Sequence, residues 1–182
     1  CTAMGAKVLG IDLTKRFDHV EEFYRADLSD GATIDALIDV LPKGIDGIAN
    51  IAGLPPTAPA DKVLAVNLFG LKHLTLGLIP KLNDGASIVN LASLAGFGWP
   101  DAIPAIRASE TIHVDDAARF ARDHQITNEG GRSYFFSKEA LIAWTMQNRW
   151  TWRDRDIRMN SVSPGPVDTP ILGDFLETLG TR

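Results

Sequence analysis

Residues 133–141 read Ser133-Tyr134-Phe135-Phe136-Ser137-Lys138-Glu139-Ala140-Leu141, which places a tyrosine and a lysine four positions apart at the start of a helical pattern. Four residues make about one turn of α-helix, so Tyr134 and Lys138 leave the same face. A fixed ammonium beside a phenol lowers the pKa of the phenol from its usual value of ~10. Tyr134 is therefore a candidate general acid/base, although the same spacing also occurs by chance on solvated helix surfaces.

Composition restricts the class of protein. The 182 residues are 45% hydrophobic, which suffices for one domain with a sizeable core. A net charge of -5 without a basic tract argues against nucleic acid or an anionic membrane as the main partner. Cys1 is the single cysteine and excludes an internal disulfide framework, and no apolar run approaches the roughly 20 residues of a bilayer span. We expect a cytoplasmic protein that binds a small molecule in a pocket and holds no metal.

Short apolar runs alternate with amphipathic helical patterns along the chain. Strands are expected at residues 6–12, 23–28, 46–53, 86–93 and 158–163. Helices are expected at residues 30–41, at 61–82, from 133 past 144, and from 171 onward. This alternation predicts an α/β fold, a doubly wound parallel sheet of the Rossmann-like kind, in a single dinucleotide-binding domain over residues 1–182.

Asp12 ends the 6–12 strand, the place where dinucleotide-binding folds use an acid to accept hydrogen bonds from the adenosine ribose. Its charge would repel a 2'-phosphate, so NAD is expected as the cofactor and NADP is less favoured. Two observations leave this open. Asp12 could simply cap the chain after the strand, and the neighbouring Lys15 and Arg16 could accept a phosphate.

Three further polar positions stand at places where chemistry is possible. Asn50-Ile51-Ala52-Gly53 is a strand end whose small residues let the backbone pass close to a flat ligand. Asn67 lies inside a helical pattern, where an amide is either satisfied in the core or functional. Ser93 ends a strand, where serine either forms a turn or presents its hydroxyl at the ligand-binding edge of the sheet. A Ser-His-Asp hydrolase is rejected because no Gly-x-Ser-x-Gly elbow is present.

The chain resembles the short-chain dehydrogenase/reductase family from Lys7 to about Leu179. The motifs that carry the resemblance stand in this order: Asn50–Gly53, Asn67, Ser93, the Tyr134/Lys138 pair and Pro164-Gly165. The resemblance implies hydride transfer between a nicotinamide cofactor and an alcohol or its carbonyl partner. It implies four catalytic residues: Asn67, Ser93, Tyr134 and Lys138. The implied cofactor-binding residues are Asp12, Asp27, Leu28, Asn50, Ala52, Gly53, Tyr134, Lys138, Pro164, Gly165, Val167 and Thr169.

The resemblance also implies a role for most of these side chains. Ser93 would orient the substrate oxygen, and Lys138 would bind the nicotinamide ribose and depress the pKa of Tyr134. Asn67 would bend its helix and hold a water of the proton relay. Asp27-Leu28 would hold the adenine edge, although a plain strand-to-helix turn explains that pair equally well. Pro164-Gly165 and Thr169 would face the nicotinamide.

Part of the expected fold is missing from the sequence. A dinucleotide fold begins with a strand and a Gly-rich turn, and none precedes Asp12. Members of the family also continue past Arg182 into a helix and a last strand. We therefore expect an internal piece of a longer protein, without the first and C-terminal strands. In the order 3-2-1-4-5-6 a lost first strand would separate the Lys7 strand from the Gly47 strand.

The interval between Ser93 and Tyr134, 41 positions, is longer than the family usually has, so residues 99–132 are expected to be inserted. A helix is expected from about Ser109 to His124. The insertion, and the matches at Lys138–Ile142 and Ser163–Leu172, resemble a subgroup that contains 3α-hydroxysteroid dehydrogenase/carbonyl reductase and coniferyl-alcohol dehydrogenase.

This subgroup implies a bulky apolar alcohol, a hydroxysteroid or a cinnamyl-type alcohol. The insertion could cover the four-helix subunit interface common in the family, or wall the pocket with Phe97, Trp99 and Phe120. A solvated excursion is the third possibility. A homodimer is expected. Two other functions stay open: a non-catalytic dinucleotide-sensing module, and a nucleotide-sugar epimerase or dehydratase, which shares the Tyr-Lys pair.

Overall fold

The computed structural model describes residues 1–14, 19–168 and 172–179. Its strands are β1 (Leu9–Asp12), β2 (Glu22–Arg25), β3 (Ile45–Asn50), β4 (Leu82–Leu91) and β5 (Arg158–Val162). Its α-helices are α1 (Gly31–Val40), α2 (Ala60–Leu64), α3 (Leu71–Leu78), α4 (Ile103–Ala108), α5 (Ala117–Asp123), α6 (Arg132–Asn148) and α7 (Leu172–Leu179). A π-helix (Ala65–Gly70) joins α2 to α3, and a 3-10 segment (Leu94–Ala102) precedes α4.

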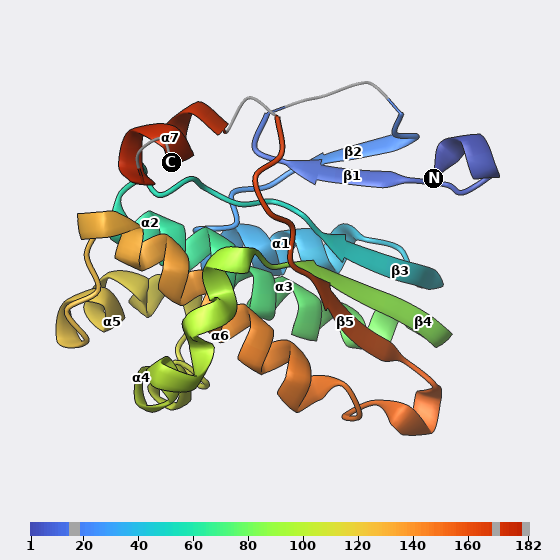
Figure 1. Cartoon of the computed structure of the whole chain (residues 1–182). Helices are drawn as coiled ribbons and strands as arrows, with labels where there is room; N and C mark the ends of the chain where they lie inside the picture. The colour runs from blue at the N-terminus through green and yellow to red at the C-terminus, as the bar shows by residue number, and fades with distance from the viewer. Residues whose placement is uncertain (15–18, 169–171, 180–182) are drawn as a thin grey trace.

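All strand pairs are parallel, and they form two sheets of order β1-β2 and β3-β4-β5 (Figure 1). Gly10 lies opposite Phe23, and Asn50 lies opposite Asn90. The predicted doubly wound strand order is therefore confirmed, including the separation of β1 from β3. The strands β1, β2, β3 and β5 are shorter than predicted, and β4 is longer. β2 stops before Asp27, whose carboxylate accepts the Ser29 N–H and turns the chain toward α1.

The helices α1, α3 and α6 gather on one face of the three-stranded sheet (Figure 1). The side chains of Ile34, Leu68, Ile88, Phe136 and Leu141 are fully buried between these layers. Each such side chain stabilises the fold by roughly 1.5–3 kcal/mol. The opposite face is more open among the described residues, since Val89 and Val162 are 37% and 52% exposed.

The long helical segment Ala60–Lys81 corrects one expectation. It has 22 residues and a mean hydropathy of 1.5, enough in length and composition for a membrane span, although no such run was expected. Two thirds of the most apolar stretch (67%) is buried inside the fold, which is typical of the core helix of a globular protein.

The 99–132 segment contains α4 and α5 instead of the single helix expected over 109–124. The reason is a buried lysine. Lys72 of α3 donates hydrogen bonds to the carbonyls of Ser109 (2.9 Å) and Glu110 (3.0 Å), just after the end of α4. An ammonium at a helix C-terminus is electrostatically favourable, and it takes up carbonyls that a continuing helix would need.

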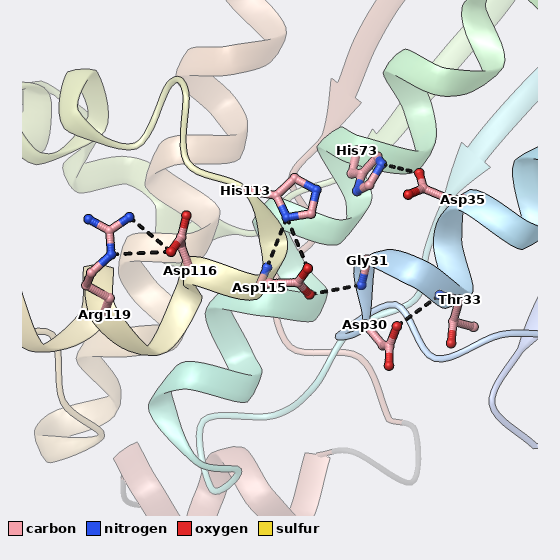
Figure 2. A network of polar contacts seen from close by, with 9 residues as sticks. All are labelled: Asp30, Gly31, Thr33, Asp35, His73, His113, Asp115, Asp116 and Arg119. Carbon is pink, nitrogen blue, oxygen red and sulfur yellow. Dashed lines mark hydrogen bonds and ion pairs between the residues drawn. The ribbon is translucent and has the colours of Figure 1, made fainter.

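A second polar cluster joins the 99–132 segment to α1 and α3 (Figure 2). Asp115 accepts a hydrogen bond from the N–H of Gly31 (3.0 Å), the first residue of α1. The ring of His113 lies 4.8 Å from the ring of His73, which in turn contacts Asp35 at 2.8 Å. A Cβ at Gly31 would lie 2.7 Å from Cε1 of His113, so the loop packs directly on the helix terminus.

The π-helix is held close to the turn after β2 by Gly70. A Cβ on Gly70 would lie 1.9 Å from the Leu28 carbonyl oxygen and 2.9 Å from that of Ala65. Gly70→Ala should therefore destabilise the fold by more than about 3 kcal/mol, because two backbone segments must separate. Urea unfolding measures this change.

Gly173→Ala is the matched control, since no heavy atom lies within 4 Å of a Cβ there. It should be neutral or slightly stabilising. Equal unfolding midpoints for Gly70→Ala and the parent would contradict the close packing.

Candidate active site

The N-terminal half of α6 carries the Tyr134/Lys138 pair at the carboxyl end of β4. The helix begins after Gly131, which has φ 73° and is a left-handed residue that favours glycine. Ser133 fastens this end, since its hydroxyl donates to Asn128 (3.0 Å) and its N–H donates to the Thr127 carbonyl (2.9 Å). The start of α6 is therefore fixed by the chain that leaves the 99–132 segment.

Tyr134 is 8% exposed, and its phenol interacts with the hydroxyl of Ser93. Burial raises the pKa of the Tyr134 phenol, and the interaction with Ser93 acts in the opposite direction with the smaller effect. This differs from the predicted lowering by Lys138. The reason is that the phenolate loses its hydration in the core and gains only the Ser93 contact in return.

Lys138 is buried, and its Nζ donates a 2.7 Å hydrogen bond to the Leu91 carbonyl, the last residue of β4. The same Nζ lies 5.5 Å from the centroid of the Tyr134 ring. Burial lowers the pKa of the Lys138 ammonium to about 8. Sequence reasoning placed the two side chains on one face but did not find Leu91, because a backbone partner leaves no signal in the residue type.

Asn67 lies in the π-helix and is 1% exposed. Its Oδ1 accepts from the Leu54 N–H (2.7 Å), and its Nδ2 donates to the Leu54 carbonyl (3.0 Å). The side chain therefore holds the loop after β3, and β3 ends earlier than predicted because this loop bonds to the helix. The irregular helix agrees with the expected bend, while the water-holding role stays a prediction.

The expected cofactor residues lie at strand ends. Asp12 ends β1, with its carboxylate exposed and bonded to the Thr14 N–H (2.8 Å). Asp27 accepts two bonds from Ser29, which lower its pKa. Thr169, Lys15 and Arg16 lie outside the described residues.

Two neighbouring strand ends supply the remaining expected positions. Ala52 and Gly53 are exposed after β3, and Pro164, Gly165 and Val167 follow β5. The Pro164 carbonyl accepts the Leu94 N–H at 3.1 Å, which holds the β4 and β5 ends together.

Asn50 was predicted among the cofactor-binding residues, and that role stays a prediction. Its side chain is 9% exposed and turns into the core. Its Nδ2 donates to Asn90 (2.8 Å) and to Thr75 (2.9 Å). The amide of Asn50 therefore joins β3 to β4 and α3.

The residues at this edge fit a dinucleotide. The Asp12 carboxylate can accept from a ribose diol, and the Lys138 ammonium has three N–H groups, of which the Leu91 carbonyl takes one. Ile51 and Leu94 are 66% and 61% exposed and provide apolar surface for flat rings. Among the described residues, no group of three or more His, Cys, Asp or Glu could hold a metal ion.

The helix α7 lies against the Tyr134 side chain. Phe175 packs its ring edge to face with Tyr134, with centroids 4.9 Å apart at 78°. Asp174 accepts a 2.8 Å hydrogen bond from the Thr57 hydroxyl, in the loop before α2. Sequence reasoning found the apolar helix but missed the Thr57 contact, because the two residues are 117 positions apart.

Phe120 is not a pocket wall, contrary to one of the predicted alternatives. It is 3% exposed and packs in the core against Phe69 and Phe136, with ring centroids 5.4 Å and 5.7 Å away. The reason is that α5 packs on α2, and Phe120 reaches from it to Phe136 of α6. Phe97, by contrast, is 87% exposed.

Comparison with known proteins identifies the family. A coniferyl-alcohol dehydrogenase from Pseudomonas sp. is 38% identical over 178 residues, which are 97% of this chain and 69% of that protein. The chain belongs to the short-chain dehydrogenase/reductase family. A 3-alpha-hydroxysteroid dehydrogenase/carbonyl reductase from Comamonas testosteroni is 32% identical over 179 residues, covering 93% of this chain and 66% of that protein. No protein-family model matches the chain.

A solved structure supports the same assignment. The 3-alpha-hydroxysteroid dehydrogenase from Pseudomonas sp. B-0831, complexed with NADH, superposes with a TM-score of 0.76 at 28% identity. The match covers 94% of this chain and 67% of that one. This short-chain dehydrogenase/reductase chain thus spans about two thirds of the length of the relatives it matches.

The buried lysines of this short-chain dehydrogenase/reductase should make its stability depend on pH. Burial lowers the pKa of both Lys138 and Lys72 from 10.5 to about 8. Between these values the unfolded chain binds more protons than the folded chain, so the free energy of unfolding should rise as pH rises from 8 toward 10.5. Lys138→Met should reduce this rise and stabilise the fold below pH 8 by up to about 3 kcal/mol.

Urea unfolding at a series of pH values measures both effects. Lys72→Met is the matched control, because it should reduce the same slope from a position outside the Tyr134 site. An unchanged slope in both variants would refute the lowered pKa values.

Proposed function

We propose that this short-chain dehydrogenase/reductase transfers hydride reversibly between NAD and a secondary or allylic alcohol and its carbonyl partner. The observation that carries the proposal is the proximity of three side chains, Tyr134, Ser93 and Lys138. The Tyr134 phenol interacts with the Ser93 hydroxyl, and the Lys138 ammonium lies 5.5 Å from the centroid of the Tyr134 ring. The three side chains come from the end of β4 and the start of α6, so the fold brings acid, orienting hydroxyl and cation to one place.

In this mechanism Tyr134 gives a proton to the carbonyl oxygen during reduction and takes it back during oxidation. The Ser93 hydroxyl donates to the same oxygen and stabilises the charge that develops there. Oxidation of the alcohol requires the Tyr134 phenolate as the base, and burial disfavours this charged form. The Ser93 hydroxyl is the group in place to favour it.

The cofactor would be held by residues at the strand ends. The Lys138 ammonium would donate to the nicotinamide ribose, and the Asp12 carboxylate would accept from the adenosine ribose. Ala52, Gly53 and Pro164-Gly165 would line the rings, where small residues keep the backbone accessible. The nicotinamide, when bound, supplies the hydride chemistry itself.

The substrate would be a bulky apolar alcohol, such as a hydroxysteroid or a cinnamyl-type alcohol. Leu94 follows Ser93 directly and is 61% exposed, and Phe175 packs edge to face on Tyr134. Apolar side chains thus flank the reacting groups on two sides. The names of the two relatives, a coniferyl-alcohol dehydrogenase and a 3-alpha-hydroxysteroid dehydrogenase/carbonyl reductase, support the same class.

The competing functions have less support. A dinucleotide-sensing module has no need of a buried tyrosine that lies close to a serine hydroxyl and an ammonium. An epimerase or dehydratase would share the Tyr-Lys pair, but the two relatives described above carry the names of dehydrogenases. We retain a homodimer and a cytoplasmic location as parts of the proposal.

Tyr134→Phe tests the acid/base role in the full-length protein. It keeps the ring and removes the proton, so turnover of hydroxysteroids and cinnamyl-type alcohols should fall by about 10²–10⁴-fold. Nicotinamide absorbance follows the reaction. Tyr24→Phe is the matched control and should keep normal turnover, because Tyr24 is the other tyrosine of this chain and bonds the surface residue Glu22. Near-normal turnover in Tyr134→Phe would end the proposed mechanism.

Asp12→Asn tests the role of Asp12 in the preference for NAD over NADP. The parent protein should use NAD at lower concentration than NADP, and removal of the carboxylate charge should narrow this preference by about tenfold or more. The ratio of kcat/KM values for the two coenzymes measures it. Asp46→Asn makes the same change of charge at the amino end of β3 and should leave the ratio unchanged. A parent protein that prefers NADP would overturn the assignment of Asp12.

A further inference from the structure

Four buried polar side chains form one chain of hydrogen bonds between the sheet and two helices. Asn50 of β3 and Asn90 of β4 lie opposite each other in register, while Thr75 comes from α3 and Thr145 from α6. Each of the four is at most 9% exposed. Three of them, Thr75, Asn90 and Thr145, have no part in the catalytic and cofactor roles described above.

The direction of every bond in this chain follows from the hydroxyl groups. Thr75 and Thr145 each donate their one hydroxyl hydrogen to the carbonyl four residues earlier in their own helix, at 2.7 and 2.8 Å. Toward the asparagines both oxygens can therefore only accept. Asn50 Nδ2 donates to Thr75 (2.9 Å) and to Asn90 Oδ1 (2.8 Å), and Asn90 Nδ2 donates to Thr145 (2.9 Å).

The α6 end of this chain lies close to the reacting groups. Thr145 follows Lys138 by seven residues, about two helical turns, so both side chains leave the same face of α6. Asn90 directly precedes Leu91, whose carbonyl accepts the Lys138 ammonium at 2.7 Å, and Ser93 follows shortly after. Two separate hydrogen bonds therefore tie α6 to the same short end of β4.

We propose that Asn90 and Thr145 are positioning residues for the active site. Their hydrogen bond sets the position of α6 along its axis relative to β4. It thereby sets the placement of Tyr134 and Lys138 relative to Ser93. Apolar contacts between the layers cannot do this alone, because dispersion has little directional preference, whereas a buried amide donor requires its acceptor at one distance and angle. The catalytic meaning of this placement rests on the proposed function.

Thr145→Val in the full-length protein tests the proposal. The substitution keeps the shape, removes the acceptor and leaves one Asn90 N–H without a partner. A displacement of about 1 Å at reacting groups can cost ~10²-fold in rate, so kcat should fall by about tenfold or more while KM changes little. Thr145→Ser restores the hydroxyl and should recover most of the rate. Asn90→Leu removes the bond from the β4 side and should lower kcat in the same way, should Thr145→Val fail to fold.

A second measurement does not depend on turnover. Phenolate absorbance, taken as the difference between each variant and the same variant with Tyr134→Phe, reports the titration of Tyr134 alone. The midpoint of this titration should shift in Thr145→Val and should return to the parent value in Thr145→Ser. Thr75→Val is the matched control, an equally buried loss of a hydroxyl in the same network at α3. It should lower the unfolding midpoint without moving the Tyr134 titration.

The outcomes separate the two proposals. If Thr145→Val loses stability as Thr75→Val does, but keeps the parent kcat and Tyr134 titration, the hydrogen bond serves stability only and the positioning role is wrong. If the parent protein turns over no alcohol, yet the Tyr134 titration moves in Thr145→Val, the proposed function fails and the positioning role stands.

Discussion

A buried ammonium that donates to a backbone carbonyl is the constraint on which this structure depends. Lys138 donates a hydrogen bond to the Leu91 carbonyl at the end of β4. This contact holds the N-terminal half of α6 at the carboxyl edge of the sheet. Because a carbonyl carries no net charge, it compensates the buried cation only in part, and the pKa of Lys138 falls to about 8. The fold thus holds a group at the end of β4 whose burial is destabilising.

The same physical device recurs in the 99–132 segment. Lys72 is also buried, also donates to backbone carbonyls and also has its pKa lowered to about 8 by burial. It fastens the turn after α4 to α3, while Asp115 fastens the following loop to the first turn of α1. The segment therefore lies on the helical layer that also carries Asn67 and Tyr134, through polar contacts at its turns and through Phe120 in the core.

The electrostatics of the site differ from a simple pairing of charges. A lysine one helical turn from a tyrosine suggests a lowered phenol pKa, yet burial raises it in the folded chain. The two effects depend on different features. Spacing along a helix is a local property, whereas loss of hydration depends on everything that packs around the group, including Phe175 from the distant α7.

From the sequence by itself, hydrophobic periodicity predicted the alternation of strands and helices and short motifs indicated the family, because both signals are local in the chain. The strand order and the separation of β1 from β3 followed from the doubly wound fold that these signals imply, and Ser93 was placed at the ligand-binding edge of the sheet because it ends a parallel strand. Only the tertiary structure decided where side chains with two possible uses point. Asn50 donates a hydrogen bond to Asn90, and Asn67 accepts one from the Leu54 N–H. Phe120 is buried in the core and does not line the pocket. The reason is that a polar or aromatic side chain takes the partner that packing brings within reach, and that partner lies far away in the sequence.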